Sequence, residues 1–249
     1  MNIIIFDTET TDLNKCFCYN IGYVIANTET KDILVKKDFV VEQIWHNLPL
    51  FSTAYYSDKR PIYVNRMRAK QTKMAKYGYI CQEIIRDIKK YDVVSAYAYN
   101  SPFDEKVFNF NCDWFKCINP FDTIPVFDIR GFVHCGLVDN DYIAFCESNS
   151  KFTESGNYST TAETVFQYLI NDVDFTEEHT ALSDSIIEFY ILMKSVEKGG
   201  LNLLEQYQVK RSITRNVEKI LTVQTKDKAY RFKCNGYTVS RSKDLIKLK

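Results

Sequence analysis

The chain has 249 residues, of which 45% are hydrophobic and 26% charged, with 8 Gly and 5 Pro. This composition is typical of soluble globular proteins and excludes the disordered, collagenous and fibrous classes. The longest apolar runs, such as residues 3–6, are far shorter than the roughly 20 residues of a membrane-spanning helix. The N-terminus lacks the pattern of a secretory signal, so we expect a cytoplasmic protein with no membrane partner.

The net charge of zero hides an asymmetry along the chain. Residues 210–249 contain 12 Lys and Arg against 3 Asp and Glu, whereas the first 209 residues contain 20 against 29. The sequence therefore predicts an acidic body that carries a basic tail.

Eight cysteines are spread through the chain and form no C-x-x-C pair. This pattern predicts reduced, mostly buried thiols. A structural zinc site is not predicted, because the nearest candidates, Cys112 with Cys117 and His134 with Cys135, lack a second pair at a suitable spacing.

The first half of the chain predicts strands followed by alternating helix and strand. Apolar residues predict strands at 2–6, 18–26 and 33–41, the last two joined by a polar turn. Residues 42–78 predict an irregular connection that contains some helix and a basic cluster. Further on, the spacing of isoleucines predicts a helix over 80–88, a buried strand follows at 93–97, and Pro102 suits the first turn of a helix over 103–110.

The second half is predicted to be mainly helical. Thr-Thr-Ala-Glu at 160–163 matches a capping box that opens a helix to about residue 170, and a second helix is expected over 177–194. A helix over 203–218 and a hairpin within 220–239, turning at Asn235-Gly236, would complete the chain. This order predicts an α/β architecture, with one domain over 1–200 and a basic C-terminal extension over 201–249.

Three segments carry carboxylates in positions suited to chemistry. Asp7 and Glu9 end the first strand and share one face of it, because side chains two residues apart in a strand project together. Asp104 follows a buried strand at the start of a helix, and His179 and Asp184 stand at the start of another. Each segment alone also fits an ordinary role as a solvated charge or a helix cap.

Taken together, the motifs Asp7-x-Glu9, Asn100-x-x-Phe103-Asp104 and His179-x-Ala181-x-x-Asp184 resemble those of the DEDD superfamily of 3′–5′ exonucleases. A histidine five residues before the last aspartate is typical of its DEDDh branch, which includes the proofreading epsilon subunit of bacterial DNA polymerase III and RNase T. The related DEDDy branch has a tyrosine where this chain has Thr180.

This resemblance covers roughly residues 1–195 and implies a ribonuclease-H-like fold, with a central mixed five-stranded sheet flanked by helices. Residues 42–79, residues 131–157 and the basic tail do not match the family pattern.

The resemblance also implies the chemistry. Four carboxylates and an imidazole suit phosphodiester hydrolysis with two Mg²⁺ or Mn²⁺ ions. By analogy, Asp7, Glu9 and Asp184 would hold the ion nearest the attacking water, Asp7 would bridge to a second ion, and Asp104 would support that ion. His179 would take the proton from the water. The products would be nucleoside 5′-monophosphates.

For substrate binding we expect contributions from the two strand-end segments. The expected residues are Thr8, Thr10, Leu13, Asn100 and Phe103. Leu13 and Phe103 are equally suited to plain core packing, and the role of Asn100 is open.

The expected partners are single-stranded 3′ ends of nucleic acid, and a polymerase or other replication protein fits the family. The resemblance to proofreading enzymes favours DNA, with an RNA-trimming exoribonuclease and a non-catalytic nucleic-acid-binding accessory protein as alternatives. The tail suits phosphate tracking and base stacking, but also a solvated hairpin or a docking site for an acidic partner. Its cations and aromatic residues are Lys226, Lys228, Tyr230, Arg231, Phe232, Lys233, Tyr237, Arg241 and Lys243.

Overall fold

The structure is a computed structural model that describes residues 1–210, residue 213 and the strands at 218–224 and 229–235. The chain divides into two compact units. The larger consists of Met1–Lys151 and Thr160–Arg211, and the smaller of Phe152–Ser159 and Ser212–Lys249.

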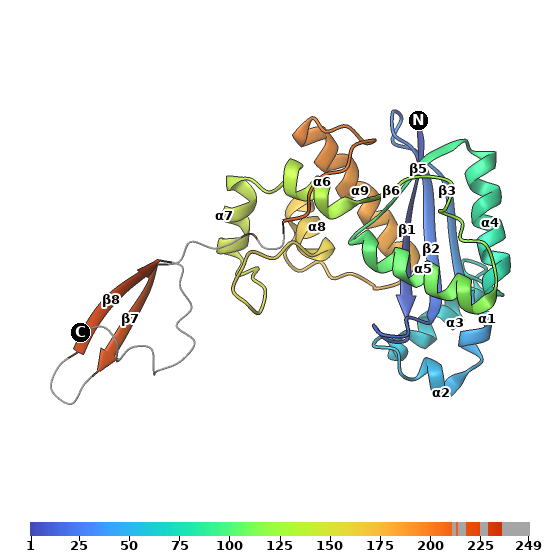
Figure 1. Ribbon diagram of the computed structural model, residues 1–249, viewed down its shortest axis with the longest axis horizontal. Helices are drawn as coiled ribbons and strands as arrows, with labels where there is room; N and C mark the ends of the chain where they lie inside the picture. Colours follow the sequence, from blue (N-terminus) through green and yellow to red (C-terminus); the bar gives the residue numbers. More distant parts are fainter. Residues whose placement is uncertain (211–212, 214–217, 225–228, 236–249) are drawn as a thin grey trace. The chain divides into compact units, whose positions relative to one another are not determined.

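A six-stranded mixed sheet is the centre of the larger unit (Figure 1). Its order is β4-β3-β2-β1-β5-β6, with the pairs β1/β2 and β2/β3 antiparallel and the pairs β1/β5, β5/β6 and β3/β4 parallel. The strands are β1 (Asn2–Thr10), β2 (Cys18–Asn27), β3 (Ile33–Val41), β4 (Lys73–Ala75), β5 (Val93–Ala98) and β6 (Val126–Asp128).

The expected sheet is thus confirmed as mixed and corrected from five strands to six. The added edge strand, β4, is only three residues long and lies in the connection that the sequence left irregular. So short a strand carries no readable alternation of apolar and polar residues.

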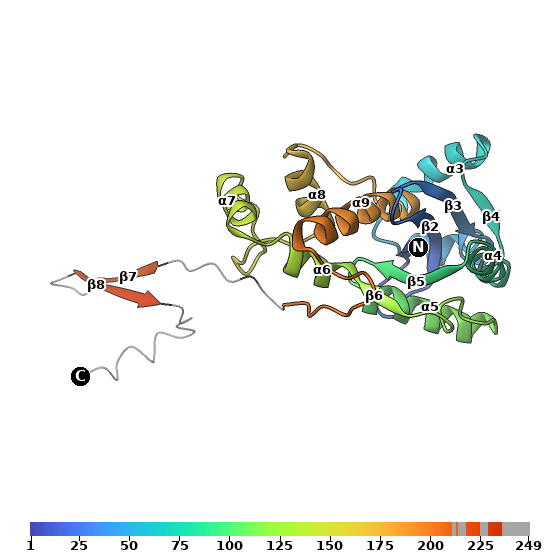
Figure 2. The same cartoon turned by 90° about the horizontal axis from the view of Figure 1, so that it is seen from above.

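Helices cover both faces of this sheet (Figure 2). Helices α4 (Tyr77–Lys90) and α5 (Ser101–Phe115) pack on one face, and α9 (Ala181–Gly199) packs on the other. The remaining helices are α1 (Glu42–Trp45), α2 (Leu48–Phe51), η1 (Ser57–Lys59), α3 (Arg60–Arg68), α6 (Ile129–Gly136), α7 (Asn140–Ser148) and α8 (Ala162–Ile170). None of the helices in the described ranges is both long and apolar enough to span a membrane.

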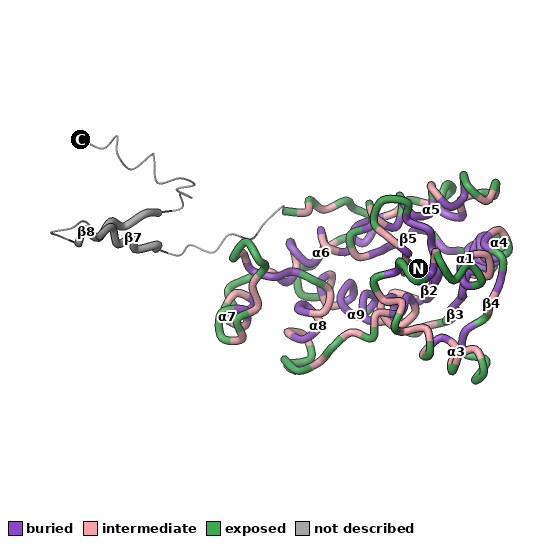
Figure 3. The backbone as a smooth tube through the Cα atoms, turned by 90° about the horizontal axis from the view of Figure 1, so that it is seen from below, coloured by how far each residue is buried: buried purple, intermediate pink, exposed green. Residues whose placement is uncertain are grey.

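The core lies between the sheet and these helices, and the central strands are buried along almost their whole length (Figure 3). Strand β2 is apolar on both faces because helices cover both sides of it. On the α5 side, the ring of Phe6 stacks on Phe121 at a centroid distance of 4.0 Å and meets Phe108 edge-on at 5.6 Å. These aromatic contacts fix α5 against β1.

Two helix starts differ from the expected ones. Thr161, one residue later than expected, caps α8 by accepting a hydrogen bond from the Thr164 N–H. The Glu163 carboxylate accepts from the Glu177 N–H at 3.0 Å and so does not complete a capping box. Helix α9 begins at Ala181 and not at residue 177, because His179 has φ of 53° and Thr180 is extended, which interrupts helical geometry.

The helix expected from residue 203 is wrong over the described residues 203–210, which form a turn and an irregular segment. The segment is docked along α6. The ring of Tyr207 packs on Phe132 at 4.9 Å, and the Lys210 N–H donates to Nδ1 of His134 at 2.9 Å. These contacts outweigh the weak helical pattern of the segment.

The smaller unit contains a hairpin. Strand β7 (Glu218–Gln224) pairs antiparallel with β8 (Ala229–Asn235), and Tyr158 pairs with Phe152 and with Ile213. Residues 230–232, the first strand of the predicted hairpin, lie in β8. The predicted turn at Asn235-Gly236 and the partner strand at 237–239 extend outside the described residues.

Candidate active site

Strand β1 presents the first two carboxylates on the face that meets α9. Asp7 and Glu9 alternate with Thr8, whose side chain projects from the opposite face. There the Thr8 hydroxyl donates a hydrogen bond to Oδ1 of Asp104 at 2.6 Å, which fixes that carboxylate against the end of β1.

Asp104 stands in the first turn of α5, at the carboxyl end of β5. The chain reverses sharply between the two elements, with Asn100 in the left-handed region (φ 64°) and Pro102 in the first helical turn, as expected. Asp104 is 2% exposed. Burial raises its pKa to about 7, against the effect of the Thr8 hydrogen bond.

Helix α9 supplies the fourth carboxylate, and a glycine lets it approach. Gly22 on β2 is the cross-strand partner of Asp7, so both face the same helix. A Cβ at Gly22 would lie 2.0 Å from the backbone nitrogen of Leu182, and the Ser185 hydroxyl donates to the Gly22 carbonyl at 3.1 Å. This contact brings Asp184, in the first turn of α9, over β1.

These elements bring Asp7, Glu9 and Asp184 together, with ligand oxygens that all lie within 4.8 Å of one another. Burial first, and then the charges of neighbouring carboxylates, raises the pKa of Asp7 and of Glu9 well above its usual range. For Asp7 the largest of these charges is Asp104. Burial also raises the pKa of Asp184 to about 7. An all-oxygen donor set whose members repel one another suits hard divalent cations.

Glu188 is a fifth carboxylate of this region that the sequence reasoning missed. It lies one helical turn after Asp184 and is 3% exposed, and its side chain accepts a hydrogen bond from the Tyr99 N–H at 3.3 Å. Burial, followed by the charges of Asp104 and Asp184, raises its pKa well above the usual range. An acidic residue four positions after Asp184, between the apolar Ile187 and Phe189, was the available signal.

His179 is placed in an adjoining group with Glu163 and Glu177, whose ligand atoms lie within 4.8 Å of one another. Its Nδ1 is 3.8 Å from Oε2 of Glu177, and its ring stacks on Tyr56 at a centroid distance of 4.6 Å. Burial and the charge of Lys59 lower the pKa of His179, which favours the neutral imidazole. Burial, followed by the charge of Asp184, raises the pKa of Glu177 to about 8. The group that contains His179 therefore interacts electrostatically with the group that contains Asp184.

A pocket of about 260 Å³ opens beside Glu9. Four of the five expected substrate-binding residues line it: Thr8, Thr10, Leu13 and Phe103. Leu13 is 73% exposed, so its side chain is not part of the core. Tyr55 and Tyr56 complete an apolar wall, and sequence reasoning missed both because they lie in the unassigned connection.

Asn100, the fifth of these residues, lines a different and larger cavity of about 710 Å³. Its backbone N–H donates to Oδ1 of Asp128 at 2.9 Å, and its side-chain oxygen is 3.5 Å from Nη1 of Arg130. The structure therefore places Asn100 at the turn into α5 and apart from the pocket at Glu9.

No protein-family model and no curated protein matches this chain. Solved structures do match it. The nuclease domain of 3′hExo, described as a DEDDh family member and bound to rAMP, matches with a TM-score of 0.52 at 16% identity, over 80% of this chain and 92% of that one. A 3′-exonuclease in a structure of histone mRNA stem-loop recognition gives 0.53 at 15% identity, over 80% and 82%.

E. coli Exonuclease I, in complex with an oligonucleotide, matches with a TM-score of 0.50 at 12% identity and over 80% of this chain. The chain spans only 41% of the length of that enzyme. At these identities the comparisons concern the fold. The chain has the fold of the DEDDh-family 3′-exonucleases.

Proposed function

We propose that the chain is a metal-dependent 3′–5′ exonuclease that releases nucleoside 5′-monophosphates from single-stranded 3′ ends. The observation that carries the proposal is the convergence of Asp7, Glu9 and Asp184, with Asp104 beside them, at the strand ends of a DEDDh exonuclease fold. These residues come from three separate elements, so a shared purely structural role does not account for them.

The donor set fits Mg²⁺ or Mn²⁺, because it is all oxygen and its carboxylates repel one another when no cation is present. Asp7, Glu9 and Asp184 would hold one ion, and Asp7 and Asp104 a second. When bound, two such ions stabilise the charge on the attacking and leaving oxygens of a phosphodiester. The Thr8 hydroxyl keeps Asp104 oriented toward the site.

His179 is proposed to accept the proton of the attacking water. Its lowered pKa leaves the imidazole neutral near pH 7, which is the state that a general base requires. Stacking on Tyr56 restricts the ring, and Glu177 lies near its Nδ1.

The pocket lined by Leu13, Phe103 and Tyr56 is proposed to hold the terminal nucleotide. Its apolar wall suits stacking on a base, which does not depend strongly on sequence. Thr8 and Thr10 supply polar groups at its edge.

DNA is the favoured substrate because the sequence motifs resemble those of proofreading enzymes. RNA is the second candidate, supported by the bound rAMP and the histone mRNA stem-loop named for two of the similar structures. A polymerase or other replication partner stays a proposal of the sequence resemblance alone.

The test is release of mononucleotides from 3′-labelled and 5′-labelled single-stranded DNA and RNA, with Mg²⁺, with Mn²⁺ and with EDTA. We expect shortening from the 3′ end that requires a metal. Asp7→Asn should abolish it, and His179→Ala should slow it by about 10²- to 10⁴-fold. The DNA-to-RNA ratio identifies the substrate class.

Matched controls are Asp174→Asn and His46→Ala, which make the same chemical changes at exposed positions. Circular dichroism establishes that every variant is folded. If the native chain binds oligonucleotides but cleaves none with either metal, the accessory-protein alternative replaces the proposed enzyme.

A further inference from the structure

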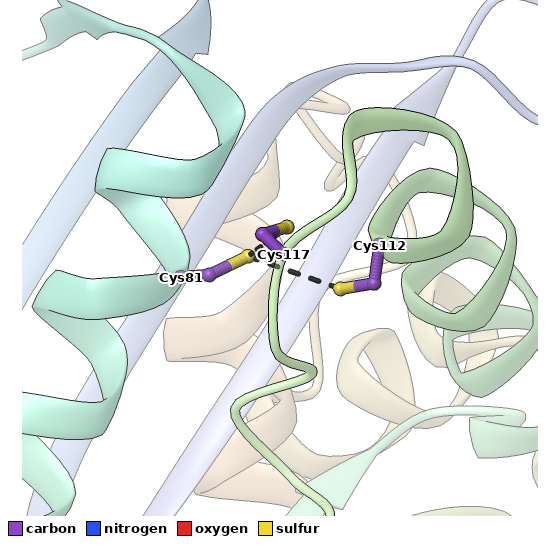
Figure 4. A group of neighbouring side chains, drawn as sticks. All are labelled: Cys81, Cys112 and Cys117. Atoms are coloured by element: carbon purple, nitrogen blue, oxygen red, sulfur yellow. Dashed lines mark hydrogen bonds between the residues drawn. The ribbon is translucent and has the colours of Figure 1, made fainter.

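Three cysteine thiols meet on the side of the sheet that α4 and α5 cover (Figure 4). Cys81 comes from α4, Cys112 from the last turn of α5, and Cys117 from the loop that follows. The Sγ atom of Cys81 is 4.0 Å from that of Cys112 and 3.9 Å from that of Cys117, and all three sulfurs lie within 4.8 Å of one another.

The backbone after α5 is shaped to return Cys117 to this position. Lys116 has φ of 54°, in the left-handed region, and the Cys117 N–H donates to the Cys112 carbonyl at 3.0 Å. This helix-ending turn reverses the chain within one residue. Cys117 therefore faces back toward α4.

The sulfur separations match those of ligands that share one ion. Tetrahedral zinc with Zn–S bonds of about 2.3 Å places its sulfurs about 3.8 Å apart. Cys81 and Cys112 are buried, whereas Cys117 is partly exposed and leaves a side open to solvent. A fourth, water ligand can therefore reach an ion held by the three sulfurs.

A tyrosine hydroxyl lies beside the thiols. The Tyr77 side chain lies one turn before Cys81 on the same face of α4, and its buried hydroxyl interacts with the Cys112 thiol. A phenol hydroxyl in this position is placed to donate to a metal-bound thiolate.

We propose that Cys81, Cys112 and Cys117 bind one Zn²⁺ ion, with the Tyr77 hydroxyl donating to a bound sulfur. This site is distinct from the carboxylate site in ligand chemistry, since thiolates select soft ions and carboxylates hard ones. Its role is to join α4 to the C-terminal end of α5, the helix whose first turn carries Asp104.

The test uses the full chain purified from zinc-supplemented medium, with excess Mg²⁺ to occupy the carboxylate site. We expect one zinc per chain by mass spectrometry of the metal content, and loss of that ion in Cys117→Ser. Tyr77→Phe should retain the site with an affinity lower by roughly tenfold or more. Cys135→Ser, which removes an exposed thiol on α6, is the matched control and should keep the ion.

Cobalt provides a readout that depends on sulfur ligation alone. Co²⁺ added to the metal-free chain should give a thiolate-to-cobalt charge-transfer absorption in the native chain and in Cys135→Ser, but not in Cys117→Ser. Absence of this absorption from the native chain, or its full retention in Cys117→Ser, would overturn the proposal. So would a Cys81–Cys112 or Cys81–Cys117 disulfide that forms equally fast with and without Zn²⁺.

Circular dichroism of the metal-free variants separates lost ligation from lost folding. Cys117 is the chosen position because it is the least buried of the three. If Cys117→Ser does not fold, two experiments test the same site. One is the metal content of Cys117→Ala, and the other is cobalt titration of the native chain after its exposed thiols have been alkylated.

Discussion

Single carboxylates of the candidate active site keep their protons to an unusually high pH. Asp184 and Asp104 each have a pKa of about 7, against an ordinary value of 3.8, chiefly because they are buried. The folded, metal-free protein therefore keeps protons that the unfolded chain releases between about pH 4 and 7. Stability of the metal-free protein should fall as the pH rises through this window.

Replacing Asp184 by Asn removes one of these costly charges. With EDTA present, Asp184→Asn should raise the free energy of unfolding by about 2 kcal/mol more at pH 8 than at pH 5. Urea unfolding at the two pH values measures this. Mg²⁺ should stabilise the native chain at pH 8 but not the variant, and Asp174→Asn is the control. An equal change at both pH values would contradict the proposed electrostatics.

His134 titrates in the opposite sense. It is 4% exposed, its Nδ1 accepts from the Lys210 N–H at 2.9 Å, and burial lowers its pKa from 6.5 to about 4. The folded protein thus holds the neutral ring, and the stability that this provides is present above pH 6.5 and lost as the pH falls toward 4.

The native chain should therefore lose about 2 kcal/mol of unfolding free energy relative to His134→Gln between pH 7 and pH 4. Chemical unfolding of both proteins across this range measures the difference. His46→Gln makes the same change at an exposed position and serves as the reference. A difference that is constant with pH would show that the ring of His134 is free to protonate in the folded protein.

At the scale of elements, the site depends on how closely α9 crosses β2. Gly22→Ala would place a Cβ within 2.0 Å of the Leu182 nitrogen, and backbone cannot move aside as a flexible side chain can. We expect a loss of about 2–4 kcal/mol in stability and a large loss of nuclease activity, because Asp184 moves with the helix.

Gly78→Ala is the matched control for this change. At Gly78 in α4 the nearest atom to an added Cβ is at an ordinary contact distance of 3.6 Å. Alanine is the better helix former, so stability should rise by about 0.5–1 kcal/mol. Thermal melts and nuclease assays of the two variants check both expectations, which fail if Gly22→Ala behaves like Gly78→Ala.

Elements with a long repeating pattern could be predicted from the sequence. The strands β2 and β3 and the helix α4 carry enough alternation or helical spacing to be located closely. Short elements such as β4 and α1 carry too few residues for any period. The start of α9 was misplaced because its acidic lead-in resembles a helix start, whereas His179 adopts a left-handed backbone.

The site was predictable where its members share a local motif. Asp7 and Glu9 could be paired from strand periodicity, and the carboxylate of Asp184 joins them in the structure. The approach of Cys81 to Cys112, which is 31 residues away, depends on the packing of α4 on α5. No local pattern reports such a contact, so Cys112 and Cys117 could be noted as neighbours in the sequence but Cys81 could not be placed beside them.

At the scale of the whole molecule, the proposed nuclease would bind a polyanion on an acidic body, and the phosphate-tracking interpretation assigns the phosphate contacts to the basic tail. Changing Lys226, Lys228 and Arg231 to Gln in the full chain should weaken binding of single-stranded DNA. If each contacts a phosphate, the slope of log affinity against log salt should fall by about 2, since each contact on a single strand contributes about 0.7.

Fluorescence anisotropy at several salt concentrations measures that slope. Changing Lys31, Lys89 and Lys90 to Gln removes the same charge from exposed positions of the body and is the control. An unaltered slope in the tail variant would exclude phosphate tracking by these residues.

The arrangement of the carboxylates also affects the chain while it is being made. Asp7 and Glu9 are synthesised first, but Asp184 lies on α9, the last helix of the larger unit. A growing chain therefore has an incomplete acidic set until that helix has left the ribosome and packed at Gly22. Until then the proposed nuclease lacks one carboxylate of its metal site, and the messenger RNA is the nearest nucleic acid.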